Sequence, residues 1–385
     1  MTSTATKIST PSNVYMASIS DIHLAHPRTD TYHIIQNLRN AFPDDEETAK
    51  LDIIFFAGDV FDRLMNLPQD EVDAIQSWIA DLLRICSKND IIVRVLEGTP
   101  SHDWRQSKQF VNVNNTLDVP ADLKYVDTLS IETIEKLGGL SVLYVPDEWN
   151  ADASVTWKQV LELAAIHGME KIDVACMHGS FDYQLPIESA KNHNSQNYMD
   201  LIRYFIVIGH VHIRTERGGK ILAQGSFDRL SHGEEDAKGH YRAKITPEGK
   251  KHWFVENTGA RIYKTLDCRN LTVDQSLELL AEYSDFPDKS NFRLKISRGG
   301  AVQHGLKDLR KAYPQFRINT QMDELKEQEK QVLVNDKVAT VKPISITETN
   351  ISHLVLERIK RQGGNEDDPK TIGILAVLDR YKTAN

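Results

Sequence analysis

The sequence has few cysteines, no long apolar run and no net positive charge. Its 385 residues include 3 cysteines, which lie far apart without a Cys-x-x-Cys pair, so the spacing of a disulfide framework or a thiolate zinc site is absent. No apolar run is long enough to span a bilayer, and no membrane partner is expected. The formal net charge of −9 gives no overall basic signature for nucleic acid, although local patches carry such binding.

The N-terminus lacks an apolar segment. Residues 1–13 are rich in Ser and Thr, which predicts a disordered lead-in and not a signal peptide. The 3 cysteines each lie in an apolar run, as buried, reduced thiols do. Both observations favour a cytoplasmic protein.

Five short stretches rich in His and Asp stand out in what the sequence does contain. Each follows an apolar run typical of a buried strand, and strand ends deliver side chains to one edge of a sheet. We therefore expect the five stretches to converge on one site. They are Ser-Asp-Ile-His at 20–23, Gly-Asp-Val-Phe-Asp at 58–62, Gly-Thr-Pro-Ser-His-Asp at 98–103, Met-His-Gly at 177–179 and Gly-His-Val-His at 209–212.

The side chains of these stretches suit metal ions. Carboxylates and imidazoles together favour a divalent transition metal, and the lack of thiolates favours Mn²⁺ over a closed structural zinc. Buried without ions, such groups would repel one another or stay unpaired. They are numerous enough for two divalent ions that share an aspartate, the usual arrangement for hydrolysing phosphate esters.

The order of predicted elements indicates the fold class. Apolar runs at 14–19, 51–57 and 91–96 alternate with helical patterns at 30–41 and from Pro68 onward. This order predicts parallel connections and an α/β layered domain. Later apolar runs predict further strands at 124–134, 140–145, 172–176 and 205–208.

The composition shifts near residue 260. From there the pattern predicts strand, helix, strand, helix (302–313) and strand, which would form a small separate domain over residues 260–320. This segment holds 11 Lys and Arg against 7 Asp and Glu, a local positive excess. Residues 321–343 are charged and aperiodic, which indicates a linker. Two amphipathic helices are predicted within residues 344–385.

The ordered motifs resemble the calcineurin-like metallophosphoesterase superfamily, whose pattern is DxH, GDxxD, GNH[DE], GH and GHxH. Downstream, Gly225-Ser226 followed by Ser231, Gly233 and Glu234 is similar to the GS…S-x-GE stretch of one branch. That branch is the nuclease subunit of the SbcCD and Mre/Rad DNA-repair complexes, whose phage-encoded members are similar in size. The implied fold is a layered metallophosphoesterase sandwich (residues 14–259), a small βαβ DNA-capping domain (260–320) and C-terminal helices (344–385). The implied compartment is the cytoplasm of a bacterium or an infected host.

The resemblance implies roles for the matching positions. His102 corresponds to the family's catalytic histidine, which acts on the phosphate or the leaving group, and Asp103 would orient it. Two divalent ions, most simply Mn²⁺, would be held by the other motif residues. Asp21, His23 and His212 would hold one ion, His178 and His210 the other, and Asp59 would bridge the two.

The third motif departs from the family pattern. Two residues are added, and Ser101 stands where the family has the Asn that supplies a carbonyl ligand. Either the second ion is held weakly, or Ser101, Thr99 or a water takes the place of the Asn. Residues 147–149, which follow the predicted strand at 140–145, form a loop near the site to which no role is assigned.

The function that the resemblance implies is a Mn-dependent DNA exonuclease and endonuclease. Such a subunit works as a homodimer with an SMC-like coiled-coil ATPase, onto which the C-terminal helices would dock. Two alternatives stay open: a stand-alone phosphoesterase acting on small phosphoesters or phosphoproteins, and a weakly catalytic subunit that binds DNA ends. The basic residues expected to hold DNA phosphates are Arg293, Lys295, Arg298, Lys307, Arg310 and Lys311.

Overall fold

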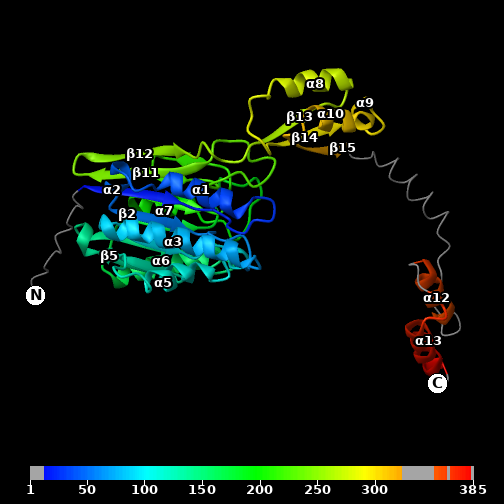
Figure 1. The fold of residues 1–385 in the computed structure, drawn as a ribbon. Coiled ribbons are helices and arrows are strands. Elements are labelled where there is room, and N and C mark those ends of the chain that lie inside the picture. The colour runs from blue at the N-terminus through cyan, green and yellow to red at the C-terminus, as the bar shows by residue number, and fades with distance from the viewer. Residues whose placement is uncertain (1–12, 323–350, 362–364, 383–385) are drawn as a thin grey trace, which may run out of the picture. The chain divides into compact units, whose positions relative to one another are not determined.

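The computed structural model describes residues 13–322, 351–361 and 365–382, and the chain divides into two units, Met1–Met322 and Asp323–Asn385 (Figure 1). The predicted lead-in falls outside the described residues except for Asn13, and so does the predicted linker except for its first two residues. Those two belong to a strand, β15 (Arg317–Met322), so the linker prediction began too early. Among the helices described, none is long and apolar enough to cross a bilayer.

The first of two six-stranded sheets has the order β12-β11-β1-β2-β3-β4. Strands β1 to β4 are parallel to one another, and the hairpin β11-β12 adds to β1 in antiparallel fashion. The carboxyl ends of β1, β2 and β3 therefore lie at one edge. The strands are β1 (Val14–Ile19), β2 (Ile53–Ala57), β3 (Ile92–Leu96), β4 (Leu123–Val126), β11 (Gly239–Thr246) and β12 (Gly249–Glu256).

The second sheet has the order β5-β6-β7-β8-β10-β9, with β6, β7, β8 and β10 parallel. Its strands are β5 (Ser130–Ile134), β6 (Leu140–Val145), β7 (Ile172–His178), β8 (Ile202–Gly209), β9 (Thr215–Arg217) and β10 (Ile221–Ala223). The prediction of a single strand over residues 124–134 was wrong. The segment is two strands, and the chain crosses from the first sheet to the second between β4 and β5.

Three apolar cores hold four layers together. The two sheets face each other across one core, to which the first contributes Phe55 and the second Tyr144 and Phe205. The outer face of the first sheet is covered by helices α1 (Thr31–Ala41), α3 (Gln69–Lys88) and α5 (Gln109–Asn114), which bury residues such as Ile34 and Trp78. Helices α6 (Ala153–Ile166) and α7 (Ser195–Leu201) cover the second sheet. The layers form an α/β sandwich (Figure 1), as the strand and helix order predicted.

Four short helical turns complete the sandwich. One of them, α4, carries most of the third motif, and it begins at the proline that follows Thr99. The turns are α2 (Glu46–Ala49), α4 (Pro100–Asp103), η1 (Gln106–Lys108) and η2 (Glu135–Leu137).

A three-stranded parallel sheet follows the sandwich. Helices cover the face of this sheet that carries Phe292 and Leu294, where Leu309 packs on them. Side chains alternate along a strand, so Arg293 and Arg317 lie on the open face. The elements are β13 (Tyr263–Asp267), α8 (Val273–Ala281), β14 (Asn291–Ile296), α9 (Ala301–His304), α10 (Leu306–Ala312) and β15.

The helix predicted over residues 302–313 is divided at Gly305 into α9 and α10. The physical reason is a close approach. A Cβ on Gly305 would lie 2.3 Å from Cγ2 of Val273, the first residue of α8. Glycine allows the two helices to meet there and also ends the first of them.

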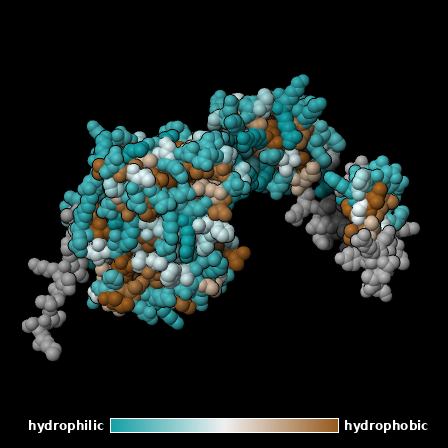
Figure 2. Space-filling view, turned by 60° about the horizontal axis from the view of Figure 1, so that its bottom comes forward, coloured by the Kyte–Doolittle hydropathy of each residue, from teal (hydrophilic) through white to brown (hydrophobic). Residues whose placement is uncertain are grey.

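The second unit holds two helices, α12 (Ile351–Arg361) and α13 (Pro369–Lys382), packed against each other. The predicted apolar stripe of α12 is half-buried, at positions such as Leu354 and Ile359. On α13, by contrast, apolar side chains are exposed, and Figure 2 shows hydrophobic residues on the surface of this unit. They are Ile372 (54% exposed), Ile374 (47%) and Val377 (51%).

Candidate metal centre

The five motifs meet at one edge of the sandwich. Asp21 and His23 follow β1, Asp59 follows β2, the third motif follows β3, and the fourth and fifth end β7 and β8. The structure brings their side chains into three overlapping groups, in each of which the candidate ligand atoms all lie within 4.8 Å of one another. The groups are Asp21, His23 and His212; His23, Asp59 and His102; and Asp59, His178 and His210.

Strained backbone aims these side chains at one another. Asp21, His23, Asp59 and His210 have φ angles of 49°, 53°, 51° and 102°, in a region that residues other than glycine rarely adopt. Such strain persists only where the surroundings enforce it, and it concentrates at functional sites. Glycine makes room as well, since a Cβ on Gly58 would lie 2.3 Å from Nδ1 of His178.

Two of the imidazoles are hydrogen-bonded through Nδ1, and a third has its Nδ1 close to a carboxylate. Nδ1 of His178 lies 2.6 Å from the carbonyl oxygen of Ala57, to which it donates a hydrogen bond. Nδ1 of His23 lies 3.3 Å from Asp62, and Nδ1 of His212 lies 3.2 Å from Glu234. A proton held on Nδ1 leaves the Nε2 lone pair free, and metal-binding histidines are commonly held in this way.

The charges of the cluster call for a cation. Asp21 and Asp59 are buried, and neither forms an ion pair with a lysine or arginine among the described residues. Burial opposes ionisation of Asp59, but His178 and the hydrogen bonds from His102 and His178 outweigh it and hold its pKa well below the usual range. Burial opposes charge on His178 too, and Asp59 nevertheless raises its pKa. A bound divalent ion would supply the positive charge that protonated histidines otherwise bring to these carboxylates. The residues present therefore fit metal binding.

His102 contacts the shared aspartate. Its Nδ1 lies 2.8 Å from Oδ2 of Asp59, and its side chain is 38% exposed. The hydrogen bond that His102 donates to Asp59, opposed by partial burial, raises the pKa of His102. The outer edge of this imidazole is therefore open to a substrate, while its inner edge is held by Asp59.

Asp103 has backbone partners, and orientation of His102 by Asp103 stays a prediction. Its buried carboxylate accepts hydrogen bonds from the backbone N–H groups of Gly98 (2.8 Å), Phe61 (2.9 Å) and Asp59 (3.1 Å). Neighbouring residues on a helical turn point in different directions, so Asp103 and His102 on α4 do not face each other. Asp103 instead ties the second motif to the third. Burial and the charge of Asp59 raise its pKa.

The third motif presents Thr99, and not Ser101, to the cluster. Ser101 is exposed, and its carbonyl oxygen accepts a hydrogen bond from the Trp104 indole (2.8 Å). The hydroxyl of Thr99 lies 3.2 Å from Oδ2 of Asp59 and 3.3 Å from Nδ1 of His210. Metal ligation by Ser101 stays a prediction, and of the two side chains considered Thr99 is the one in contact with the cluster.

Glu234 supports His212 from behind. It is the last residue of the Gly-Ser…Gly-Glu stretch, to which the sequence assigned no chemical role. Its carboxylate accepts hydrogen bonds from the hydroxyls of Ser226 (3.1 Å) and Ser231 (2.9 Å). Burial opposes its ionisation, but the hydrogen bond and charge of His212 outweigh burial and lower its pKa to about 2. Lys238, fully buried, donates to the His212 carbonyl oxygen (2.7 Å).

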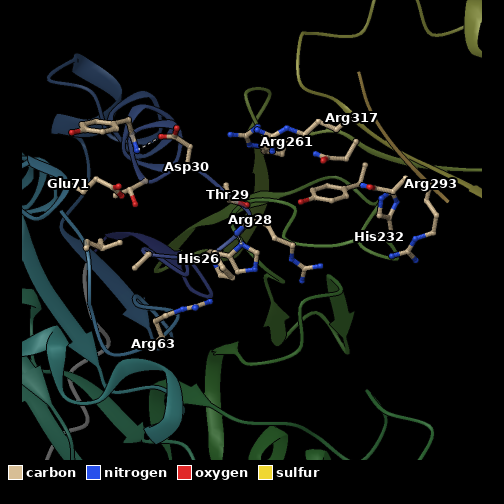
Figure 3. Close-up of a pocket in the computed structure, with 18 of the residues that line it drawn as sticks. His26, Arg28, Thr29, Asp30, Arg63, Glu71, His232, Arg261, Arg293 and Arg317 are labelled. Carbon is tan, nitrogen blue, oxygen red and sulfur yellow. Dashed lines mark hydrogen bonds between the residues drawn. The ribbon is translucent and has the colours of Figure 1, made fainter. Parts of the chain in front are cut away.

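A basic cavity of about 840 Å³ adjoins the cluster (Figure 3). It lies between the loop after β1, the start of α3 and the open face of the three-stranded sheet. His26 lines it, and the His26 N–H donates to the His23 carbonyl oxygen (3.1 Å). Five arginines line it against two acidic side chains, Asp30 and Glu71. The arginines are Arg28, Arg63, Arg261, Arg293 and Arg317.

Most of these arginines have no anionic partner. Arg63 pairs with Asp62 (2.8 Å), whereas Arg28, Arg293 and Arg317 form no ion pair within the described ranges. Nε of Arg261 is buried without a hydrogen-bond partner there. Burial, with Arg293 and Arg28 nearby, lowers the pKa of His232, also in the lining, to about 4. The cavity is thus a site of positive potential. The sequence could not single it out, because its residues come from distant segments.

The predicted DNA-binding residues are divided between two faces. Arg293 lines the cavity, Lys295 follows on the same face of β14, and Arg298 lies in the turn beyond. Lys307, Arg310 and Lys311 lie on α10, which packs on the opposite face. Arg310 also donates to the Ile318 carbonyl oxygen (3.0 Å). DNA contact by all six stays a prediction, and Arg293 is the one that lines the cavity.

Fold and cluster together define an α/β sandwich with a His/Asp centre suited to divalent metal ions. No family model matches the sequence, and no curated protein matches it. Two solved structures, one of them TT1561 of Thermus thermophilus, match at 11% identity with TM-scores of 0.38 and 0.36. The matches cover 63% of this chain and 99% and 98% of those chains. Likeness of this degree says nothing about activity.

Proposed function

We propose that the protein is a metal-dependent phosphodiesterase that cleaves DNA, with Mn²⁺ as its cation. The observation that carries the proposal is that the His/Asp cluster adjoins a cavity lined by arginines. His23 in the cluster contacts Asp62, and Asp62 pairs with Arg63 at the cavity. A phosphodiester at the cluster would thus have its neighbouring phosphates beside guanidinium groups, which bind phosphate well.

Each group has a chemical task in this proposal. Divalent ions, when bound, would neutralise the charge that develops on the phosphoryl oxygens. His102, held at Nδ1 by Asp59 and open at its other edge, would donate a proton to the leaving oxygen. The arginines would hold the strand in register, because phosphate contacts position a nucleic acid without reading its sequence.

The cavity also bears on the two alternatives. A small phosphoester would fill the metal centre and leave the arginine-lined cavity without a ligand, whereas a polyanionic strand accounts for both. A subunit that only binds DNA ends would have no use for the exposed imidazole of His102.

The test is hydrolysis of linear DNA, circular DNA and bis-p-nitrophenyl phosphate in Mn²⁺, in Mg²⁺ and in EDTA. We expect all three substrates to be cleaved in Mn²⁺ and none in EDTA. Hydrolysis of the small diester with both DNAs intact would favour a small-molecule phosphoesterase. DNA binding without cleavage would favour the end-binding subunit.

Arg293→Ala combined with Arg317→Ala should weaken DNA binding while turnover of the small diester stays within about twofold. Each lost phosphate contact removes about 0.9 from the slope of log affinity against log salt, so the slope should fall by about 2. The matched control is Lys307→Ala with Lys311→Ala, which removes the same charge from α10, the helix that covers the opposite face of that sheet. Equal weakening by the control pair would contradict a role for the cavity, and equal loss on both substrates would indicate misfolding.

We further propose that the C-terminal helices dock on an SMC-like ATPase. Exposed Ile372, Ile374 and Val377 on α13 are the kind of apolar surface that a helical partner covers. The ATPase is expected to co-purify with the full chain and to be lost from a chain that ends after Met322. Full-length Ile374→Asp with Val377→Asp should show the same loss. Undiminished binding by the shortened chain would rule out this docking element.

A further inference from the structure

Asp147 lies at the metal edge of the sandwich although it belongs to none of the five motifs. It follows β6 by two residues, and β6 pairs in parallel with β7, the strand that ends at His178. Its side chain is 7% exposed. Asp147 reaches this edge for the same reason as the motif residues, because it follows the carboxyl end of a buried parallel strand.

Its carboxylate lies beside His210, at the edge of the group formed by Asp59, His178 and His210. Oδ2 of Asp147 lies 3.5 Å from Nδ1 of His210 and accepts a hydrogen bond from the hydroxyl of Thr99 (3.0 Å). That hydroxyl lies 3.2 Å from Oδ2 of Asp59, 3.4 Å from Nε2 of His178 and 3.3 Å from His210. The Thr99 hydroxyl therefore stands among two carboxylates and two imidazoles.

These separations fit atoms that share one ion. Two ligand atoms at about 2.1 Å from an octahedral ion are about 3 Å apart at neighbouring positions and at most about 4.2 Å apart. The distance of 3.5 Å between Asp147 and His210 lies in this range, as does the 3.3 Å between His178 Nε2 and Asp59 Oδ2. Asp147 stands outside the group in which ligand atoms of Asp59, His178 and His210 all lie within 4.8 Å of one another, so it would approach the ion from the His210 side.

Among the described residues, no lysine or arginine pairs with Asp147. Across residues 13–322, 351–361 and 365–382 it forms no ion pair with lysine or arginine, and Lys191 pairs with its neighbour Glu148 instead. A buried carboxylate without a cation is costly. A divalent ion beside His210 would supply that charge.

We infer that Asp147 is a ligand of the ion that Asp59, His178 and His210 hold. It supplies the oxygen ligand that the altered third motif lacks, and it brings a negative charge where an asparagine would bring none. Thr99 is the positioning residue, because its hydroxyl donates to Asp147. This inference rests on the proposed function only in requiring that the cluster binds divalent ions.

The test is Mn²⁺ binding to the full chain by titration calorimetry, for the wild type, Asp147→Ala, Asp147→Asn and the control Glu148→Gln. We expect two ions on the wild type and on Glu148→Gln. In Asp147→Ala one of the two should bind at least about tenfold more weakly, a loss that even indirect partners of metal ligands produce. Asp147→Asn keeps the oxygen and loses the charge, so its Mn²⁺ affinity should lie between those of the wild type and Asp147→Ala.

Thermal unfolding supplies a readout independent of activity. In EDTA, Asp147→Asn should unfold at the wild-type temperature or above it, because it removes an unmatched buried charge. The rise in unfolding temperature on adding Mn²⁺ should be smaller than for the wild type. If both Asp147 variants bind two Mn²⁺ ions with wild-type affinity and show the full rise in unfolding temperature, Asp147 is not a ligand, and the proposed function is unaffected. A wild type that binds no Mn²⁺ would overturn the proposed function as well.

Discussion

Asp59→Ala is expected to abolish metal-dependent hydrolysis and to weaken the binding of both ions. Oδ2 of Asp59 lies 2.8 Å from His102, 3.3 Å from His178 and 4.0 Å from His23. The residue is common to two of the three candidate ligand groups, so its loss divides the cluster. Losing several kcal/mol of charge stabilisation in the transition state corresponds to roughly a thousandfold or more in rate.

The measurement is turnover of bis-p-nitrophenyl phosphate across a Mn²⁺ titration, together with ion binding by calorimetry. Asp118→Asn changes an exposed aspartate that belongs to none of the motifs; it serves as the control and should behave as wild type. Asp59→Asn keeps the size of the side chain and should be nearly as impaired as Asp59→Ala. Near wild-type turnover at saturating Mn²⁺ in either Asp59 variant would show that no shared ligand exists at this position.

His102→Ala is expected to lower kcat by about 10²–10⁴-fold, the usual contribution of a general acid. Its half-exposed side chain contributes little to packing, so the unfolding temperature of the variant should equal that of the wild type. The number of Mn²⁺ ions bound should hold as well, because the residue is proposed to act on the leaving group and not on a metal. Calorimetry and single-turnover cleavage of DNA together separate these roles.

His167→Ala is the matched control, since His167 is exposed at the end of α6, away from the motifs. If His102→Ala instead loses one bound ion, His102 is a ligand, as its place in a group with His23 and Asp59 would allow. If it turns over DNA at the wild-type rate, the proton comes from elsewhere.

Strand positions were predictable because burial leaves a simple trace in the sequence. The runs at 14–19 and 140–145 coincide with β1 and β6, since strands covered on both faces are continuously apolar. Parallel connections then brought the motifs to one edge, so the meeting of Asp21, Asp59 and His178 followed from the strand order. Nothing in the run at 124–134 indicated that the chain passes there from the first sheet to the second. That passage depends on which strand each half of the run pairs with, β3 for the first half and β6 for the second.

The sequence by itself determined the sandwich, the cluster and the residue types that suit metal ions. Tertiary structure alone decided that Asp103 faces backbone N–H groups, that Thr99 and not Ser101 meets the cluster, and that Asp147 contacts His210. The arginine cavity likewise draws on segments as distant as Arg28 and Arg317. The physical reason is common to all of these. A periodic pattern reports which face of an element is buried, whereas the direction of one side chain and its partners depend on contacts between residues that the chain order does not bring together.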